Sequence, residues 1–143
     1  VYGDLVYVSQ ADTDRVIRYW RAGAYQPARL HWGWMPPHPT LYLRRALYER
    51  HGVFDLRYRI AADYDLMLRV LSRLTGRVVY LPQVLVRMRL GGISNRSLRH
   101  ILRKSREDYQ ALRANQIGGL GALAWKNLSK APQFFLARFK GKS

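Results

Sequence analysis

The segment Ile60-Ala-Ala-Asp-Tyr-Asp-Leu66 leads into the most regular helical pattern of this chain. From Asp63 to Leu74, apolar side chains recur at the three- and four-residue spacing of one helix face. The members of this face are Tyr64, Met67, Leu68 and Leu71. Leu66 and Val70 widen the apolar surface, so the helix is expected to be mostly buried. Gly76 is placed to end it.

Extended segments surround this helix and alternate with other helical patterns. Strands are expected at residues 5–8, 16–20, 40–43, 78–81 and 84–90, and further helices at residues 44–50 and 97–115. The Asp-rich turn Ala11-Asp-Thr-Asp14 joins the first two strands, which predicts a hairpin. Pro82 is expected to separate the last two strands. Strands interleaved with helices predict an α/β domain with a mixed sheet and flanking helices.

The composition is that of a folded chain with a large excess of positive charge. The 143 residues are 48% apolar, include no Cys and carry a net charge of +16. Without Cys, disulfides and Cys-based metal sites are excluded. Residues 1–85 hold 12 Lys and Arg against 7 Asp and Glu, whereas residues 86–143 hold 13 against 2. The C-terminal part is therefore expected to seek anions.

The two ends of the chain carry further signals. The sequence opens at Val1 inside a strand-like run rather than at a Met, which indicates a piece of a longer frame. No run of about 18 apolar residues predicts a membrane-spanning helix. Basic and aromatic residues interleave over residues 122–140, which is typical of a segment lying on an anionic membrane surface. A solvated charged face on a terminal packing helix explains the same pattern. Nucleic acid is not expected as a partner, because no recognisable binding module is present.

Asp63 stands at the start of the predicted helix, where two roles are open. Asp is favoured at the N-cap, so its side chain can simply cap the helix. A carboxylate here also interacts favourably with the helix dipole and can accept the proton of a hydroxyl group. Asp65 lies about 200° further around the helix. The two carboxylates therefore do not form a glycosidase-type pair.

The loop Trp34-Met-Pro-Pro-His-Pro-Thr40 holds three prolines around His38. Proline fixes φ, so this loop is stiff and can present His38 and Trp34 to a ligand at a small entropic cost. The aromatic face of Trp34 suits a sugar ring. A rigid surface connection with a structural His is the alternative.

Arg87 and Arg89 share one face of the expected strand at residues 84–90. The turn Gly91-Gly-Ile-Ser-Asn95 follows this strand. Two guanidinium groups beside a Gly-rich turn can hold a phosphate. A solvated strand face is the alternative.

Taken in order, several short motifs resemble the second half of bacterial family 2 glycosyltransferases. They are Tyr2-Gly-Asp4, His38-Pro-Thr40, Arg44-Arg45, Gly52-Val-Phe-Asp55, Asp63 to Arg69 and Arg89 to Ser94. Their order and spacing match over residues 1–95, most closely in enzymes that build polysaccharide or lipopolysaccharide repeats. The resemblance implies a partial GT-A fold, which is the fold of nucleotide-diphospho-sugar transferases. Residues 1–95 then form the acceptor-side half of the catalytic domain, residues 96–117 a helix packing on it, and residues 118–143 a basic amphipathic C-terminal segment.

The resemblance also implies a reaction and its residues. Asp63 is then the catalytic base of an inverting sugar transfer from a nucleotide-sugar donor to a glycan or lipid-linked acceptor. The expected acceptor-binding residues are Trp34, His38 and Asp65. The expected diphosphate-binding residues are Arg87, Arg89 and Ser94. The Glu that often precedes the base in this family is Ala62 here.

The resemblance places the family's nucleotide-binding strands and its Asp-x-Asp-type metal motif before Val1, outside this sequence. A divalent metal, Mg²⁺ or Mn²⁺, is therefore expected in the full-length parent, with ligands outside this chain. The chain by itself is expected to be inactive. The expected location is cytoplasmic, peripheral on the inner face of the plasma membrane. The alternative function is a non-catalytic basic module that binds anionic membrane or nucleic acid.

Overall fold

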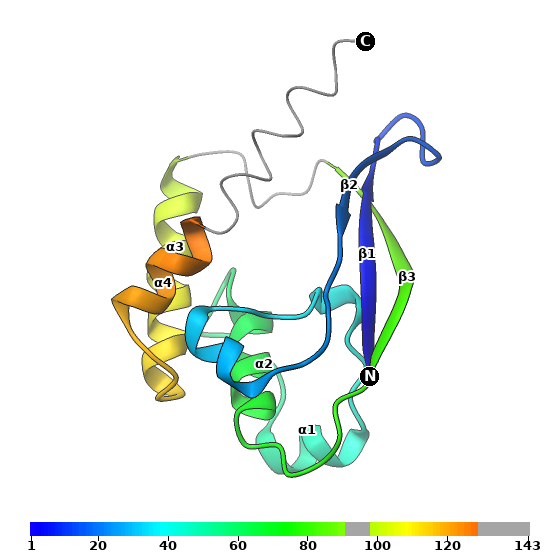
Figure 1. The fold of residues 1–143 in the computed structure, drawn as a ribbon. Coiled ribbons are helices and arrows are strands. Elements are labelled where there is room, and N and C mark those ends of the chain that lie inside the picture. Colours follow the sequence, from blue (N-terminus) through cyan, green and yellow to red (C-terminus); the bar gives the residue numbers. More distant parts are fainter. Residues whose placement is uncertain (91–97, 129–143) are drawn as a thin grey trace.

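The computed structural model describes residues 1–90 and 98–128, which form a small mixed sheet and helices on one side of it (Figure 1). The strands are β1 (Tyr2–Val8), β2 (Val16–Trp20) and β3 (Tyr80–Arg89). The helices are α1 (Arg45–His51), α2 (Ala62–Leu71), α3 (Leu98–Ala114) and α4 (Leu120–Leu128), with the short 3₁₀ helices η1 (Pro27–Trp32) and η2 (His38–Thr40). The expected mixed α/β architecture is confirmed.

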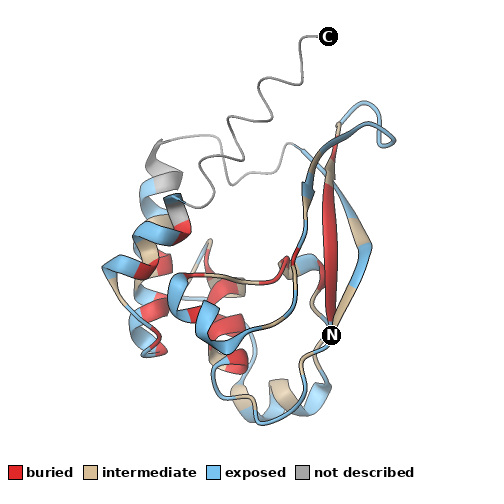
Figure 2. Ribbon diagram, viewed as in Figure 1, coloured by how far each residue is buried: buried red, intermediate tan, exposed pale blue. Residues whose placement is uncertain are grey.

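β1 is the central strand of the sheet, whose order is β2-β1-β3. It pairs antiparallel with β2, which confirms the predicted hairpin, and parallel with β3. Six of its seven residues are buried, because β1 has a neighbour on each edge and helices cover one face. Figure 2 shows burial concentrated on β1 and α2.

β3 is one continuous strand, so the expected break at Pro82 is wrong. The pairing with β1 moves from Gly3↔Leu81 to Asp4↔Val84 and then to Leu5↔Val86. These bulges take up the residues around Pro82, which has no N–H to donate to a ladder. They also bring Leu85 over β1, where a Cβ on Gly3 would lie 2.6 Å from Leu85 Cγ.

The expected strand at residues 40–43 is also wrong. Thr40 ends the 3₁₀ helix η2, and its buried hydroxyl lies 2.9 Å from Gly3 O and 2.8 Å from Pro37 O. Tyr42 exchanges two backbone hydrogen bonds with Val1, of 2.8 and 3.0 Å. The stiff loop is therefore fastened to the start of β1 by a side chain and one backbone pair rather than by a strand.

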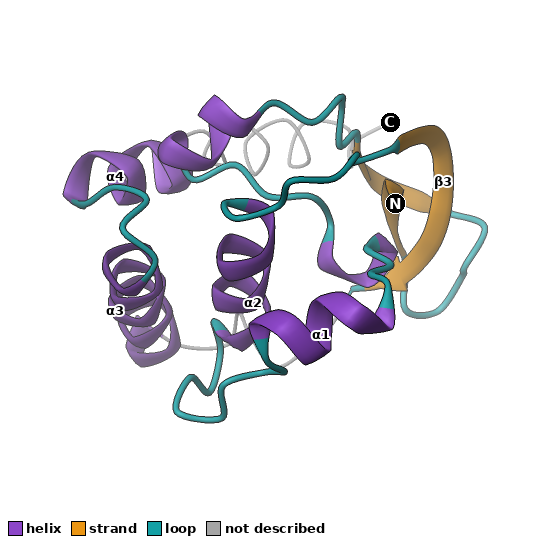
Figure 3. Ribbon diagram, turned by 90° about the horizontal axis from the view of Figure 1, so that it is seen from below, coloured by secondary structure: helices purple, strands orange, loops and turns teal. Residues whose placement is uncertain are grey.

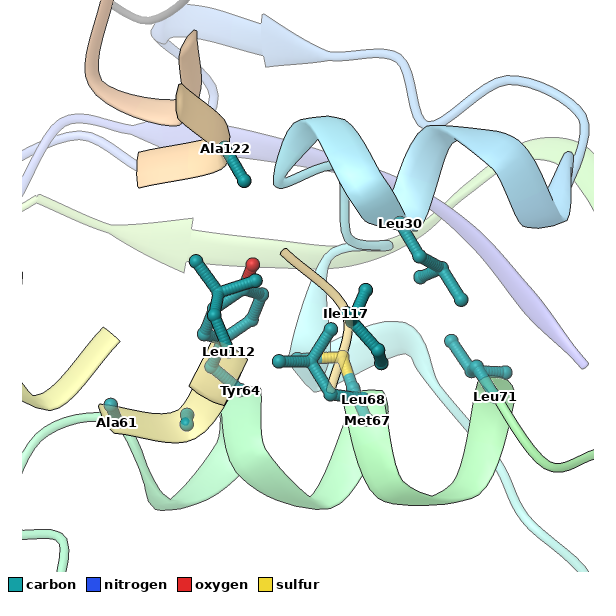
Figure 4. Packing of buried hydrophobic residues seen from close by; sticks show 10 residues of the cluster. Leu30, Ala61, Tyr64, Met67, Leu68, Leu71, Leu112, Ile117 and Ala122 are labelled. Atoms are coloured by element: carbon teal, nitrogen blue, oxygen red, sulfur yellow. The ribbon is translucent and has the colours of Figure 1, made fainter. Parts of the chain in front are cut away.

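α2 provides the centre of the core, between α3 and α1 (Figure 3). It ends at Leu71, before the Leu74 expected from the sequence. Its apolar face meets residues of η1, α3 and α4, as Figure 4 shows. The cluster comprises Leu30, Ala61, Tyr64, Met67, Leu68, Leu71, Ala111, Leu112, Ile117 and Ala122. The helical spacing read from the sequence therefore identifies the buried face correctly.

α4 is attached to this core by a buried lysine. Lys126 lies in the basic segment at residues 122–140 that the sequence predicts to face an anionic membrane, but its side chain is only 2% exposed. Its Nζ lies 2.9 Å from Asp108 Oδ2 and 3.1 Å from the centre of the Tyr64 ring. A carboxylate and an aromatic face together offset the cost of burying the ammonium group. None of the helices in the described ranges has the length and hydropathy needed to cross a bilayer.

Candidate functional site

Asp63 lies in the first turn of α2 but does not cap it. The N-cap position belongs to Ala61, which has no side-chain hydrogen bond to the helix. Asp63 Oδ1 accepts a 2.8 Å hydrogen bond from the N–H of Tyr64, and the Asp63 side chain is 34% exposed. Asp63 is therefore not the N-cap residue that the sequence suggested, and its side chain stays partly exposed.

The N-terminal end of α2 is capped from another helix, by Glu107 of α3. Glu107 Oε2 accepts hydrogen bonds from the N–H groups of Ile60 (2.7 Å) and Ala61 (3.0 Å). Helix ends need such partners for their free N–H groups. Sequence reasoning missed Glu107, because capping signals are local and this residue is far from Ala61 along the chain.

His38 faces Asp63 from the proline-rich loop. Its Nδ1 lies 3.9 Å from Asp63 Oδ2, which is too long for a hydrogen bond and fits an ion pair only when the imidazole is protonated. The His38 side chain is 39% exposed. One hydroxyl oxygen can lie about 2.8 Å from both atoms at this separation. The structure therefore brings together two of the residues that the sequence singled out.

Phe54 fixes the other side of the His38 imidazole. The two ring centres are 5.8 Å apart with an interplanar angle of 89°, an edge-to-face contact. Phe54 belongs to the Gly52-Val-Phe-Asp55 motif. That motif turns at Gly52, whose φ of +81° favours glycine. Two separate motifs thus position one imidazole.

Arg69 of α2 holds this turn in place. Its guanidinium donates to the carbonyl of His51 at 2.5 Å, to the carbonyl of Val53 at 3.0 Å and to Asp65 Oδ2 at 2.7 Å. A planar guanidinium suits several acceptors at once. The Asp63–Arg69 segment and the Gly52–Asp55 motif are therefore one connected unit.

Asp65 lies in the interior, so the structure gives no support to its expected contact with an acceptor. Its Oδ2 meets Arg69, and its Oδ1 accepts a 2.9 Å hydrogen bond from Asn115 Nδ2. Both oxygens are used within the protein, and the residue is buried. Asp65 thus links α2 to the end of α3.

Trp34 lies on the same loop as His38, but its side chain lines a different part of the surface. Its Nε1 donates to the carbonyl of Ala22 at 3.3 Å, and its ring packs 6.0 Å from the rings of Tyr2 and Tyr25. The buried Pro36 and Pro37 separate it from His38. Trp34 forms part of the wall of a groove beside β2 rather than a contact of Asp63.

The three expected diphosphate residues lie on or after β3. Arg87 and Arg89 are exposed, in register with Val6 and Val8 of β1. Arg87 Nη1 lies 3.2 Å from Asp14 Oδ1 in the β1–β2 turn. Ser94 lies outside the described residues. Within the described part of the chain, neither arginine forms an ion pair or hydrogen bond with Asp63.

Asp4 of the Tyr2-Gly-Asp4 motif joins all three strands from inside. It accepts hydrogen bonds from the Tyr19 hydroxyl (2.7 Å), the Tyr80 hydroxyl (2.8 Å) and the Ala22 N–H (2.8 Å). Burial alone would raise the pKa of Asp4, but these three hydrogen bonds together lower the pKa below its ordinary value. The Asp4 carboxylate of this motif therefore has a structural role.

Comparison with known proteins gives no relative for this chain. No protein-family model matches it, and neither a curated protein nor a solved structure does so. The function must therefore be inferred from the site and from the motifs that build it.

Proposed function

We propose that this chain is the acceptor-side part of an inverting glycosyltransferase of the family 2 type, with Asp63 as its general base. The observation that carries the proposal is the Asp63–His38 pair. One Asp63 oxygen is held by the Tyr64 N–H, and the other faces His38 across 3.9 Å with solvent access. A base needs both a fixed carboxylate and an open oxygen, and this arrangement supplies both.

The way the motifs meet also supports the proposal. The Arg69 guanidinium holds the turn that carries Phe54, Phe54 packs on His38, and His38 faces Asp63. Thr40 fastens the same loop to β1 at Gly3. Residues spread over the resembling segments thus converge on one carboxylate.

In the proposed reaction the acceptor hydroxyl binds between His38 and Asp63. Asp63 Oδ2 takes the hydroxyl proton as the acceptor oxygen bonds to the anomeric carbon of the donor sugar. The bond from that carbon to the diphosphate breaks, its electron pair leaves with the nucleotide diphosphate, and the configuration inverts. His38 orients the hydroxyl. General-base assistance of this kind contributes roughly 10²–10⁴-fold to a rate.

Donor binding is proposed to involve further parts of a longer parent. Mg²⁺ or Mn²⁺ would neutralise the diphosphate there. Within residues 1–90 and 98–128, no group of three or more His, Asp or Glu side chains could hold a metal ion. The ligands of that metal are proposed to belong to those further parts. Arg87, Arg89 and Ser94 remain proposed contacts of the diphosphate.

A peripheral position on the inner face of the plasma membrane is proposed for the parent, through the basic segment 118–143. Most of that segment lies outside the described residues. Its described part includes Trp125 and Leu128, both exposed, which suits an interfacial segment. A glycan or lipid-linked acceptor would be reached from there.

The proposal is tested with the complete polypeptide that contains this sequence and with the 143-residue chain. Each is incubated with a panel of nucleotide sugars, Mg²⁺ or Mn²⁺, and glycan or lipid-linked acceptors. We expect transfer by the complete polypeptide and none by the chain alone. No transfer from any donor by the complete, folded polypeptide would contradict the proposed function. Transfer by the chain alone would contradict its division into two parts.

A further inference from the structure

A groove of about 810 Å³ lies between β2, the η1 turn and α4. Its main lining residues are Arg18, Arg21, Arg29, Trp32, Trp34 and Trp125. The chain has four tryptophans, and all four line this groove, Trp20 being the other. Neither Asp nor Glu is among the lining residues. The groove is therefore both aromatic and uniformly basic.

The basic residues indicate an anionic ligand. Three guanidinium groups border the groove, and those of Arg21 and Arg29 belong to exposed side chains. Guanidinium forms paired hydrogen bonds with carboxylate and phosphate oxygens. Asp4, on the far side of Tyr19, is buried and takes three hydrogen bonds. Its charge also interacts with Arg21, which together with the hydrogen bonds outweighs burial and lowers the pKa of Asp4. Its oxygens are taken by these three hydrogen bonds, however, and Arg18 and Arg29 add two further positive charges at the groove.

The tryptophans indicate a ligand that carries flat apolar faces. Trp32 is 59% exposed and Trp125 is 55% exposed, although both are large aromatic residues. Their ring centres lie 6.1 Å apart at an interplanar angle of 69°, so they form two walls rather than one stacked pair. The C–H faces of sugar rings can cover such aromatic walls and remove apolar surface from water.

The size of the groove favours a compact ligand over a long polymer. Sites for small ligands occupy roughly 300–1,000 Å³, and this groove falls within that range. Grooves for single-stranded nucleic acid follow a backbone over about 4–16 nucleotides. A few sugar rings with one or two anionic groups fit the volume, the charge and the aromatic walls together.

We infer that this groove binds an acidic saccharide, a short glycan bearing carboxylate or phosphate groups. Trp34 in the groove wall and His38 beside Asp63 lie on one stiff loop, with Pro36 and Pro37 buried between them. Identifying the bound saccharide as the acceptor rests on the proposed glycosyl transfer. Binding itself does not depend on that reaction.

Intrinsic tryptophan fluorescence of the 143-residue chain tests the inference directly, because every tryptophan borders the groove. The chain is titrated with oligogalacturonate for carboxylate, with glucose 1-phosphate for phosphate, and with maltotriose as a neutral glycan. We expect saturable changes with one or both acidic sugars, and binding at least tenfold weaker for the neutral glycan. A response to only one acidic sugar identifies the anionic group. Equal binding of the neutral glycan, or no response to either acidic sugar, would overturn the inference.

Charge-matched variants locate the site. The double variant Arg21→Gln/Arg29→Gln should weaken binding of the acidic sugar at least tenfold. The double variant Arg50→Gln/Arg73→Gln removes the same charge from exposed arginines outside the groove and should bind normally. Equal weakening in both pairs would show non-specific attraction and contradict the site.

Two competitors distinguish other occupants of the groove. Tighter binding of a ten-nucleotide single-stranded DNA, or of phosphatidylglycerol vesicles, through the same arginines would replace the saccharide and overturn the inference. Failure of this inference is separate from failure of the proposed function. If the groove inference alone fails, the groove does not bind acidic saccharide but the full-length protein still transfers sugar. If the proposed function alone fails, the groove still binds acidic saccharide but no sugar is transferred.

Discussion

Glu107 on α3 accepts a 3.0 Å hydrogen bond from the N–H of Ala61, the N-cap residue of α2. A second bond of 2.7 Å comes from the N–H of Ile60. This carboxylate fixes the start of the helix and, two residues later, the direction of Asp63. The position of the proposed base therefore depends on a residue from another helix.

Replacing Glu107 with Ala should destabilise the protein. Two backbone donors lose their buried acceptor, which costs about 1–3 kcal/mol of unfolding free energy. Glu107→Gln keeps one oxygen and should recover part of that loss. Urea unfolding followed by circular dichroism measures both variants. Glu49→Ala is the control, because Glu49 forms only an exposed pair with Arg45 and should stay close to wild type. Glu107→Ala and Glu49→Ala with equal stability would disprove the capping role.

Asp4→Asn should destabilise the sheet at neutral pH and much less in acid. The pKa of Asp4 is lowered in the folded state below its ordinary value of 3.8, so its carboxylate stabilises the fold above about that pH. This stability is lost as the pH falls through the folded-state pKa. Since hydrogen bonds to a charged group contribute about 1.5–3 kcal/mol, we expect a loss of that order at pH 7. Urea unfolding of both proteins from pH 7 down to about pH 2 measures the difference across that range. A difference that stays constant with pH would contradict this role of the charge.

Gly3→Ala should disturb the join between β1 and β3. The added Cβ would lie 2.6 Å from Leu85 Cγ and 2.9 Å from Gln83 O, and overpacking of this kind costs about 1–3 kcal/mol. Gly76→Ala is the matched control, because no atom lies within 4 Å of its added Cβ. Thermal unfolding of the two variants should separate them clearly. Equal midpoints would show that Leu85 moves away at no cost.

Arg69→Lys should loosen the turn that carries Phe54. A lysine keeps the charge but cannot reach two carbonyls and Asp65 together, so we expect a loss of about 1–3 kcal/mol in unfolding free energy. In the proposed full-length glycosyltransferase, turnover should fall as well, because Phe54 packs against His38. Arg73→Lys, an exposed change just beyond α2, should alter neither property. If the Arg69→Lys protein is as stable as wild type and turns over normally, this turn does not support the site.

The sequence predicts the local elements well, because their signals are local. The apolar spacing from Tyr64 to Leu71 identifies the buried face of α2, and the Asp-rich turn identifies the β1–β2 hairpin. Two errors have physical causes. A bulge carries β3 through Pro82, and the Thr40 hydroxyl bonds to Gly3 where a strand was expected.

The site is less predictable, because contacts between distant segments build it. Asp63 and His38 could be singled out by residue type and setting, but nothing local shows that they lie 3.9 Å apart. The cap supplied by Glu107 and the burial of Lys126 against Asp108 also depend on helix packing. Asp65 carries the same side chain as Asp63, yet the turn of the helix places it in the interior.

The most direct test of the central claim is the turnover of Asp63→Asn in the proposed full-length glycosyltransferase. Asn keeps the Oδ1 atom that accepts the Tyr64 N–H bond, so the unfolding free energy should stay near wild type. It removes the base, so turnover should fall by about 10²–10⁴-fold. Asp14→Asn, which changes an exposed carboxylate in the β1–β2 turn, should lower turnover by no more than a few-fold. An Asp63→Asn enzyme that turns over within a few-fold of wild type would contradict the assignment of Asp63 as the base.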